Sequence, residues 1–134
     1  MSYPPSTAFV NPRPGDTPCY MIDQLPDYAL VSGGGLNTRE VIDRYFSELE
    51  VVVDSQRRKF GGARVLLDLN GALVNPAEIA LQIGTLSGAL FRDRDRVAVI
   101  NATALLKLQA KRVTLPHHKI FEDEASAKKW LIEP

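Results

Sequence analysis

Three short segments of this sequence contain the residue types that catalysis would require. His117 and His118 offer an imidazole base, and Ser87 lies inside the segment Gly84-Thr85-Leu86-Ser87-Gly88. That serine is one position late for a nucleophile elbow, and it falls within a helical pattern instead of a strand-to-helix turn. Because no motif links either histidine to a serine or cysteine, we interpret both histidines as exposed loop residues after Pro116. The sequence therefore predicts that this protein is not an enzyme.

The third segment, Ser32-Gly33-Gly34-Gly35, stands between a strand pattern and a helix pattern. Backbone amides at a helix N-terminus bind anions, so a phosphate site has to be considered. However, the segment lacks the G-x-G-x-x-G spacing of dinucleotide sites and the lysine of a P-loop. We favour a plain loop, and we expect no cofactor.

Asp68 is the carboxylate that stands out, because it lies inside the apolar strand pattern Arg64 to Leu69. A charged residue at the carboxyl end of a parallel strand stands where α/β folds place their ligands. The alternative is that Asp68 caps the following loop by accepting hydrogen bonds from the backbone amides of Gly71 or Ala72. We favour the capping role.

The helical pattern that follows Asn75-Pro76 and runs to about Phe91 has an unusually wide apolar surface. One stripe is apolar: Ile79, Ile83, Leu86 and Leu90. The adjacent stripe is small: Ala80, Gly84 and Gly88. We place on the opposite side Glu78, Gln82, Thr85 and Ala89. Together the first two stripes span roughly 220°. Interior glycines cost about 1 kcal/mol each relative to alanine, so the small stripe indicates close packing within the fold or contact with a ligand or a second chain.

The elements that position these residues follow from hydrophobic periodicity and from turn and capping signals. We predict strands near Tyr20–Leu25, Tyr28–Val31, Arg64–Leu69, Val97–Ile100 and Lys119–Phe121. We predict helices from Asn37 to Phe60, from Asn75-Pro76 to Phe91, from Thr103 to about Lys111, and after Asp123. Asn37 is the expected N-cap of the first helix, with Glu40 completing a capping box. Asn75 is the expected N-cap of the second, with Pro76 as its first residue.

The resulting order, β-β-α-β-α-β-α-β-α, predicts an α/β fold. Helices between successive strands imply a mostly parallel sheet of about five strands packed with four helices. The continuous apolar runs Val65–Leu67 and Val97–Ile100 predict strands buried on both faces. Arg92-Asp93-Arg94-Asp95-Arg96 is interpreted as a self-neutralising loop.

The 134 residues predict one domain, residues 19–134, after a flexible proline-rich arm, residues 1–18. The 16 basic and 16 acidic residues cancel, which argues against a general nucleic-acid partner. Cys19 and two histidines provide neither a disulfide nor a zinc set, so we expect no metal. No signal peptide is visible and the longest uninterrupted uncharged helix, Ile79 to Phe91, is too short for an integral membrane segment, so we expect a cytoplasmic protein.

Three phrases resemble the STAS domain family, the SpoIIAA-like group named for the anti-sigma-factor antagonist. Val65-Leu66-Leu67-Asp68-Leu69-Asn70-Gly71 resembles the family's strand ending in Asp-Leu-Ser-Gly, and Asp95 to Ile100 resembles its later "drvAvv" strand. Phe121 to Leu131 resembles its closing "F.d...A..WL" helix. The likeness covers about Tyr20 to Leu131 and is strongest to bacterial stand-alone SpoIIAA-like proteins, some of which are also compared with CRAL-TRIO lipid-transfer folds.

The resemblance implies a SpoIIAA-like fold and a regulatory, protein-binding module. In the antagonist branch a serine at the start of the second helix is phosphorylated, whereas Leu73 to Glu78 contains no serine or threonine. We therefore expect a non-catalytic interaction module without that phospho-switch. The alternative is a module that binds a small apolar, lipid-like ligand between helices and sheet. The partner stays open: an unknown protein, a small apolar ligand or a second copy in a homodimer. The candidate surface comprises Asp68, Asn70, Asn75, Pro76, Ala80, Gly84, Ser87 and Gly88.

Overall fold

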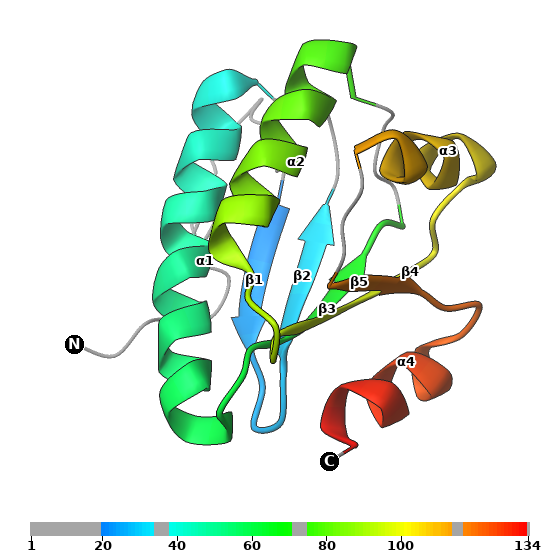
Figure 1. Ribbon diagram of the computed structural model, residues 1–134. Helices are drawn as coiled ribbons and strands as arrows, with labels where there is room; N and C mark the ends of the chain where they lie inside the picture. The colour runs from blue at the N-terminus through cyan, green and yellow to red at the C-terminus, as the bar shows by residue number, and fades with distance from the viewer. Residues whose placement is uncertain (1–19, 34–37, 71–74, 114–116, 134) are drawn as a thin grey trace, which may run out of the picture.

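The fold is a five-stranded sheet with helices on both faces (Figure 1). The computed structural model describes residues 20–33, 38–70, 75–113 and 117–133. The predicted arm, residues 1–18, lies outside the described residues. The elements are β1 (Tyr20–Gln24), β2 (Ala29–Gly33), α1 (Arg39–Phe60), β3 (Arg64–Asp68), α2 (Ala77–Leu90), β4 (Arg96–Ile100), α3 (Ala104–Val113), β5 (His118–Ile120) and α4 (Glu124–Ile132).

The predicted α/β class and element order are confirmed. The strands lie in the sheet in chain order, β1-β2-β3-β4-β5. The β1–β2 pair is an antiparallel hairpin whose strands are joined through Leu25-Pro26-Asp27, and all other pairs are parallel. A parallel sheet places the carboxyl ends of its strands at one edge and the amino ends at the other. We call these the carboxyl edge, at the top of Figure 1, and the amino edge, at the bottom.

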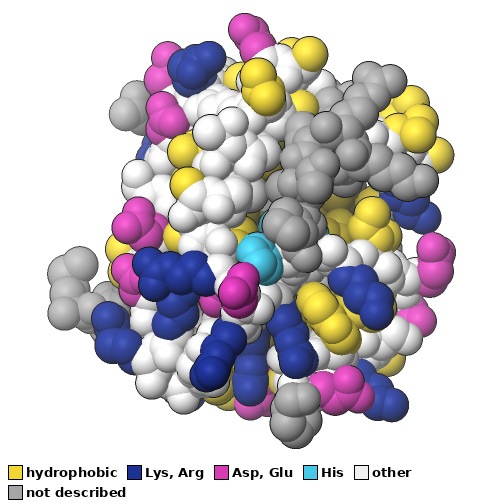
Figure 2. Space-filling view, viewed as in Figure 1, with side chains coloured by type: hydrophobic (Ala, Val, Ile, Leu, Met, Phe, Trp, Pro, Cys, Tyr) yellow, Lys and Arg dark blue, Asp and Glu magenta, His cyan; other side chains and the backbone are white. Residues whose placement is uncertain are grey.

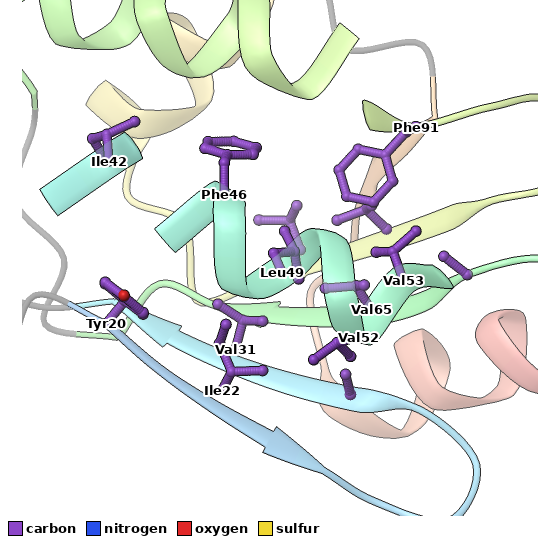
Figure 3. Packing of buried hydrophobic residues seen from close by; sticks show 14 of the residues in the cluster. Tyr20, Ile22, Val31, Ile42, Phe46, Leu49, Val52, Val53, Val65 and Phe91 are labelled. Carbon is purple, nitrogen blue, oxygen red and sulfur yellow. The ribbon is translucent and has the colours of Figure 1, made fainter. Parts of the chain in front are cut away.

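Two hydrophobic clusters, one on each face of the sheet, hold the layers together. On one face, α1 and α2 cover β1–β4, and Phe46 and Leu49 of α1 belong to one hydrophobic cluster with Val31 and Val65 of the strands (Figure 3). On the other face, Leu66, Ala98 and Ile100 pack against Ala127 and Leu131 of α4. Neighbouring residues of β3 and β4 thus enter opposite clusters, so the predicted burial of these strands on both faces is confirmed.

Capping differs by one residue from the sequence expectation at two helices. Thr38, not Asn37, is the N-cap of α1, because its side chain accepts the Val41 N–H at 3.2 Å. Glu40 consequently takes the second helical position and cannot complete the predicted capping box. In α2 the N-cap is Pro76, without a side-chain capping bond, so the expected Asn75 cap is wrong. Because the proline ring fixes φ, proline is compatible both with the N-cap position, where it lies here, and with the first helical position, where it was expected.

The predicted end of α1 is confirmed. Gly61 takes the left-handed conformation, with φ 82°, and its N–H bonds to Arg57 O at 2.9 Å. Glycine adopts this conformation without a Cβ penalty. At Gly62 a Cβ would collide with the backbone carbonyl of Arg94. The two glycines therefore bring the end of α1 against the loop that precedes β4.

Candidate functional site

Asp68 ends β3 at the carboxyl edge and is tied to the neighbouring strand end. Its Oδ1 accepts the Asn70 N–H at 2.9 Å and the Asn101 side-chain amide, Nδ2, also at 2.9 Å. Asn101 directly follows β4 and has φ 59°, a left-handed conformation that asparagine tolerates better than most residues. These contacts make Asp68 a loop-organising residue, as we favoured, but through Asn70 and Asn101. The expected partners Gly71 and Ala72 lie outside the described residues.

Sequence reasoning did not single out Asn101. The available signal was an asparagine at the end of an apolar strand, where it favours a left-handed turn. What the sequence did not provide was the adjacency of β3 and β4, in which Asp68 pairs in register with Ile100. Only that pairing brings residue 101 within reach of the carboxylate.

The expected ligand position at the end of β3 also depends on where the helices lie. In doubly wound sheets the ligand crevice opens where successive helices lie on opposite faces. Here α1 and α2 belong to the same hydrophobic cluster on one face, as Figure 1 shows. Asp68 therefore lies between two crossovers of the same side, and the topology does not create that crevice above it.

The candidate residues on α2 do not share one environment. Ala80 and Ser87 are buried, Gly84 is half-buried, and Gly88 is exposed. No described atom comes within 4 Å of the position that a Cβ on Gly88 would take. Pro76 is exposed at the carboxyl edge. Because an α-helix rises 1.5 Å per residue, Pro76 and Gly88 lie about 18 Å apart along the helix axis. The small stripe thus runs from a packed position at one end to an open one at the other.

Asn70 and Asn75 flank the loop between β3 and α2; Asn70 is exposed and Asn75 is half-buried.

Gln82 corrects the expected polar face of α2. Its exposed fraction is only 9%, and its Nε2 donates to Arg39 O at 3.2 Å and to Asp43 Oδ1 at 2.9 Å, both on α1. The expectation that Gln82 lies opposite the packed stripes is therefore wrong. Because α2 packs against both the sheet and α1, a wider arc of the helix circumference is buried than a sheet contact alone would bury.

Exposed leucines mark the outer side of α2 and the neighbouring α3. Leu81 of α2 is 66% exposed, and Leu105 and Leu108 of α3 are 63% and 54% exposed. The two helices pack against each other, and Figure 2 shows hydrophobic side chains over both. We call Leu81, Leu105 and Leu108 the leucine surface. Leu105 and Leu108 are one helical turn apart, so they share a face of α3.

The amino edge contains a second site that sequence reasoning missed. Asp95 is 4% exposed, and it accepts hydrogen bonds from Arg57 Nε at 3.3 Å and Arg57 Nη2. The backbone N–H groups of Ala63 and Arg92 also donate to it, each at 2.7 Å. Burial alone would raise the pKa of Asp95, but the hydrogen bonds from Arg57, Ala63 and Arg92 outweigh burial and lower it.

This pairing overturns the self-neutralising interpretation of the loop from Arg92 to Arg96. Asp95 pairs with Arg57, which belongs to α1, and not with an arginine of its own loop. Within the described residues, Arg92 and Arg94 form no ion pair. The loop therefore presents more positive charge than its sequence suggests.

A concave pocket opens at this loop, with a volume of about 570 Å³. Its lining combines charged groups with one aromatic ring: Arg57, Gly61, Phe91, Arg92, Asp93, Arg94, Asp95 and His117. Figure 2 shows a histidine near the middle of the face, with an acidic side chain beside it and Lys and Arg side chains to its left and below it. The pocket is therefore suited to a polar or charged group.

His118 corrects the expectation of two exposed loop histidines. It begins β5, and its ring meets Phe91 edge to face with centroids 5.5 Å apart. Its Nδ1 is buried and has no hydrogen-bond partner in the described structure. Burial, with a smaller contribution from the charge of His117, lowers the pKa of His118 to about 4.

Within the described ranges, no group of three or more His, Cys, Asp or Glu side chains is arranged to hold a metal ion. Of the helices in those ranges, none is both long enough and apolar enough to cross a membrane.

No protein-family model matches this chain, and comparison with curated proteins finds no match either.

Proposed function

We propose that this protein is a non-catalytic interaction module of the STAS-like kind and that it binds its partner through the leucine surface on α2 and α3. The observation that carries the proposal is the exposure of Leu81, Leu105 and Leu108 on two helices that pack against each other. Single exposed apolar residues are common, but several on adjacent elements are typical of a protein-binding surface. Val51 of α1, which is 51% exposed, provides a control position on a different helix.

A serine phospho-switch on α2 has little support in this surface. Ser87 is 4% exposed and lies among packed side chains, so a kinase would have to unfold the helix to reach it. Thr85 is exposed and is the hydroxyl on α2 that modification could reach. We infer that partner binding is not controlled by phosphorylation near Asn75, because residues 73–78 include no serine or threonine.

The experiment compares site-specific crosslinking at two positions of equal chemistry. A photo-crosslinking amino acid at position 81 should form a discrete adduct in cells, whereas one at position 51 should not. Leu105→Glu should abolish the adduct at 81, because a charge within an apolar interface is not tolerated, while Val51→Glu should leave it intact. An adduct at the size of a dimer would identify the partner as a second copy of this chain.

Equal adducts at positions 81 and 51, or an adduct at 81 that survives Leu105→Glu, would contradict the proposal. The apolar-ligand alternative has its own signature. Native mass spectrometry of the purified protein would then show a bound small molecule, and Gly84→Leu would remove it. Detection of such a molecule in the absence of any crosslinked partner would replace the interaction module with a ligand-binding function.

A further inference from the structure

The amino edge concentrates positive charge in a chain whose net charge is zero. Here α1 ends, β3 and β4 begin, and the loop before β4 crosses between them (Figure 1). The cations gathered at this edge are Arg57, Arg58, Lys59, Arg64, Arg92, Arg94 and Arg96. The carboxylates are fewer: Asp27, Asp54, Asp93, Asp95 and Glu133. Figure 2 shows Lys and Arg side chains side by side across the lower half of the face.

Local contacts leave most of this charge uncompensated. Among the described ion pairs at this edge, both belong to Arg57, with Asp95 and Asp54. Lys59 donates instead to Pro26 O at 3.1 Å, and Arg64 donates to Asp27 O at 3.4 Å. A carbonyl oxygen satisfies a donor but carries no net charge, so it leaves the field of the cation in place.

Arg96 behaves in the same way at the other end of this surface. Its Nη1 donates to Trp130 O at 2.6 Å and to Glu133 O at 2.7 Å. These bonds fix the guanidinium against α4 without neutralising it. Arg92 and Arg94 are exposed cations that line the pocket together with His117. Phe91 also lines this pocket.

We propose that this amino-edge surface, centred on Arg92 and Arg94, binds an acidic polypeptide segment. Arginine forks match carboxylate geometry and hold it with paired hydrogen bonds. The open 570 Å³ pocket admits one acidic side chain, and the flanking cations provide attraction to its neighbours along an extended chain. This surface lies at the opposite edge of the sheet from the start of α2, so the proposal goes beyond the function proposed above and stands independently of it.

Single-stranded nucleic acid fits the surface less well. Such binding needs aromatic faces on which bases stack. The ring of Phe60 already faces the Arg64 guanidinium at 4.0 Å and Lys59 Nζ at 5.0 Å, and the Trp130 ring faces Arg96 at 5.6 Å.

The test uses a fluorescein-labelled glutamate peptide of about ten residues, the length that could cover this edge, and fluorescence anisotropy. Wild type is compared with Arg92→Ala/Arg94→Ala and with a matched control, Arg39→Ala/Lys107→Ala, which removes the same charge from the carboxyl-edge half of the molecule. Arg92 approaches Asp95, and Arg94 approaches Gly62, through backbone atoms and the Arg94 Cβ, all of which alanine retains, so the first variant keeps the fold. A thermal melt of each variant verifies this.

Wild type and the control variant should bind the peptide with the same Kd. The amino-edge variant should bind it about tenfold or more weakly. The affinity of wild type should fall as the salt concentration rises from about 50 mM to 500 mM. Equal weakening of both double variants would overturn the proposal, because net charge alone would then explain binding. Tighter binding of a thymidine oligonucleotide of matched charge, lost in the amino-edge variant, would overturn the choice of an acidic polypeptide.

Discussion

Arg57 on α1 and Asp95 in the loop before β4 form a buried ion pair that joins segments 38 positions apart in the sequence. The carboxylate also accepts the N–H groups of Ala63 and Arg92. One side chain thereby fixes the end of α1, the start of β3 and the loop that lines the amino-edge pocket. Removing Arg57 would leave the Asp95 carboxylate buried without its charged partner, whereas removing Asp95 would leave Arg57 with Asp54 alone.

Asp95→Asn should therefore lower the free energy of unfolding by about 1.5–3 kcal/mol, the usual contribution of hydrogen bonds to a charged group. Urea denaturation measures the change. The control is Asp54→Asn, which removes the 48% exposed partner of the same arginine and should cost less than about 1 kcal/mol. Similar losses for the two variants would show that the pair contributes no more than a surface contact.

The same variant has a defined pH dependence. Because the pKa of Asp95 is lowered in the folded protein, its stabilising contribution is complete above the ordinary aspartate pKa, about 4. It is lost as pH falls further and the folded carboxylate takes up a proton. The stability difference between wild type and Asp95→Asn should thus be constant from pH 7 to 5 and shrink below about pH 4. A difference that already shrinks at pH 6 would contradict this assignment.

His118 should make the protein less stable as pH falls between about 6.5 and 4. In that window the unfolded chain binds a proton at this residue, whereas the folded state, with a pKa of about 4, does not. The contribution of His118 to stability should fall through this range and level off below it. His118→Leu should remove that slope in urea denaturation, because leucine does not titrate. The substitution also breaks no hydrogen bond at Nδ1, which has no partner in the described structure. His117→Asn should retain most of the slope, and equal effects of the two substitutions would place the cause elsewhere.

Two glycine-to-alanine substitutions should have opposite signs. Gly88→Ala should raise stability by about 1 kcal/mol, because the helix gains propensity and the new methyl group meets open space. Gly62→Ala should lower it by about 1–3 kcal/mol or more, because the methyl group collides with the Arg94 carbonyl and the loop must shift. Thermal denaturation distinguishes the two. Loss of stability in Gly88→Ala would mean that something packs against the end of the small stripe.

Asn101 and Asp68 should show coupled energies in a double-mutant cycle. Asn101→Ala should cost about 1–2 kcal/mol, because it loses the hydrogen bond and leaves an alanine in the left-handed conformation. Asn101→Gly loses only the bond and should cost less. In an Asp68→Ala background the cost of Asn101→Gly should nearly vanish. Additive effects would mean that the 2.9 Å contact contributes nothing to stability.

The sequence by itself determined the elements and their order along the chain. Alternating or continuous apolar runs marked every strand, Gly61 ended α1, and the apolar stripe of Ile79, Ile83 and Leu86 located α2. These signals are local, because periodicity and turn chemistry act over a few residues. Errors at this level were single-residue shifts, as at Thr38 and Pro76, where neighbouring residues satisfy the same capping requirement.

Only the tertiary structure decided which side chains meet. Asp95 pairs with Arg57 instead of an arginine of its own loop. Asp68, at the end of β3, contacts Asn101, which follows the neighbouring β4, and Gln82 contacts α1. Each contact joins segments more than 30 positions apart, at separations of 38, 33 and 39 residues. No local pattern specifies such partners, because they depend on strand order and on the choice of face for each helix. For the same reason the charge at the amino edge became visible only once the ends of α1, β3 and β4 lay side by side.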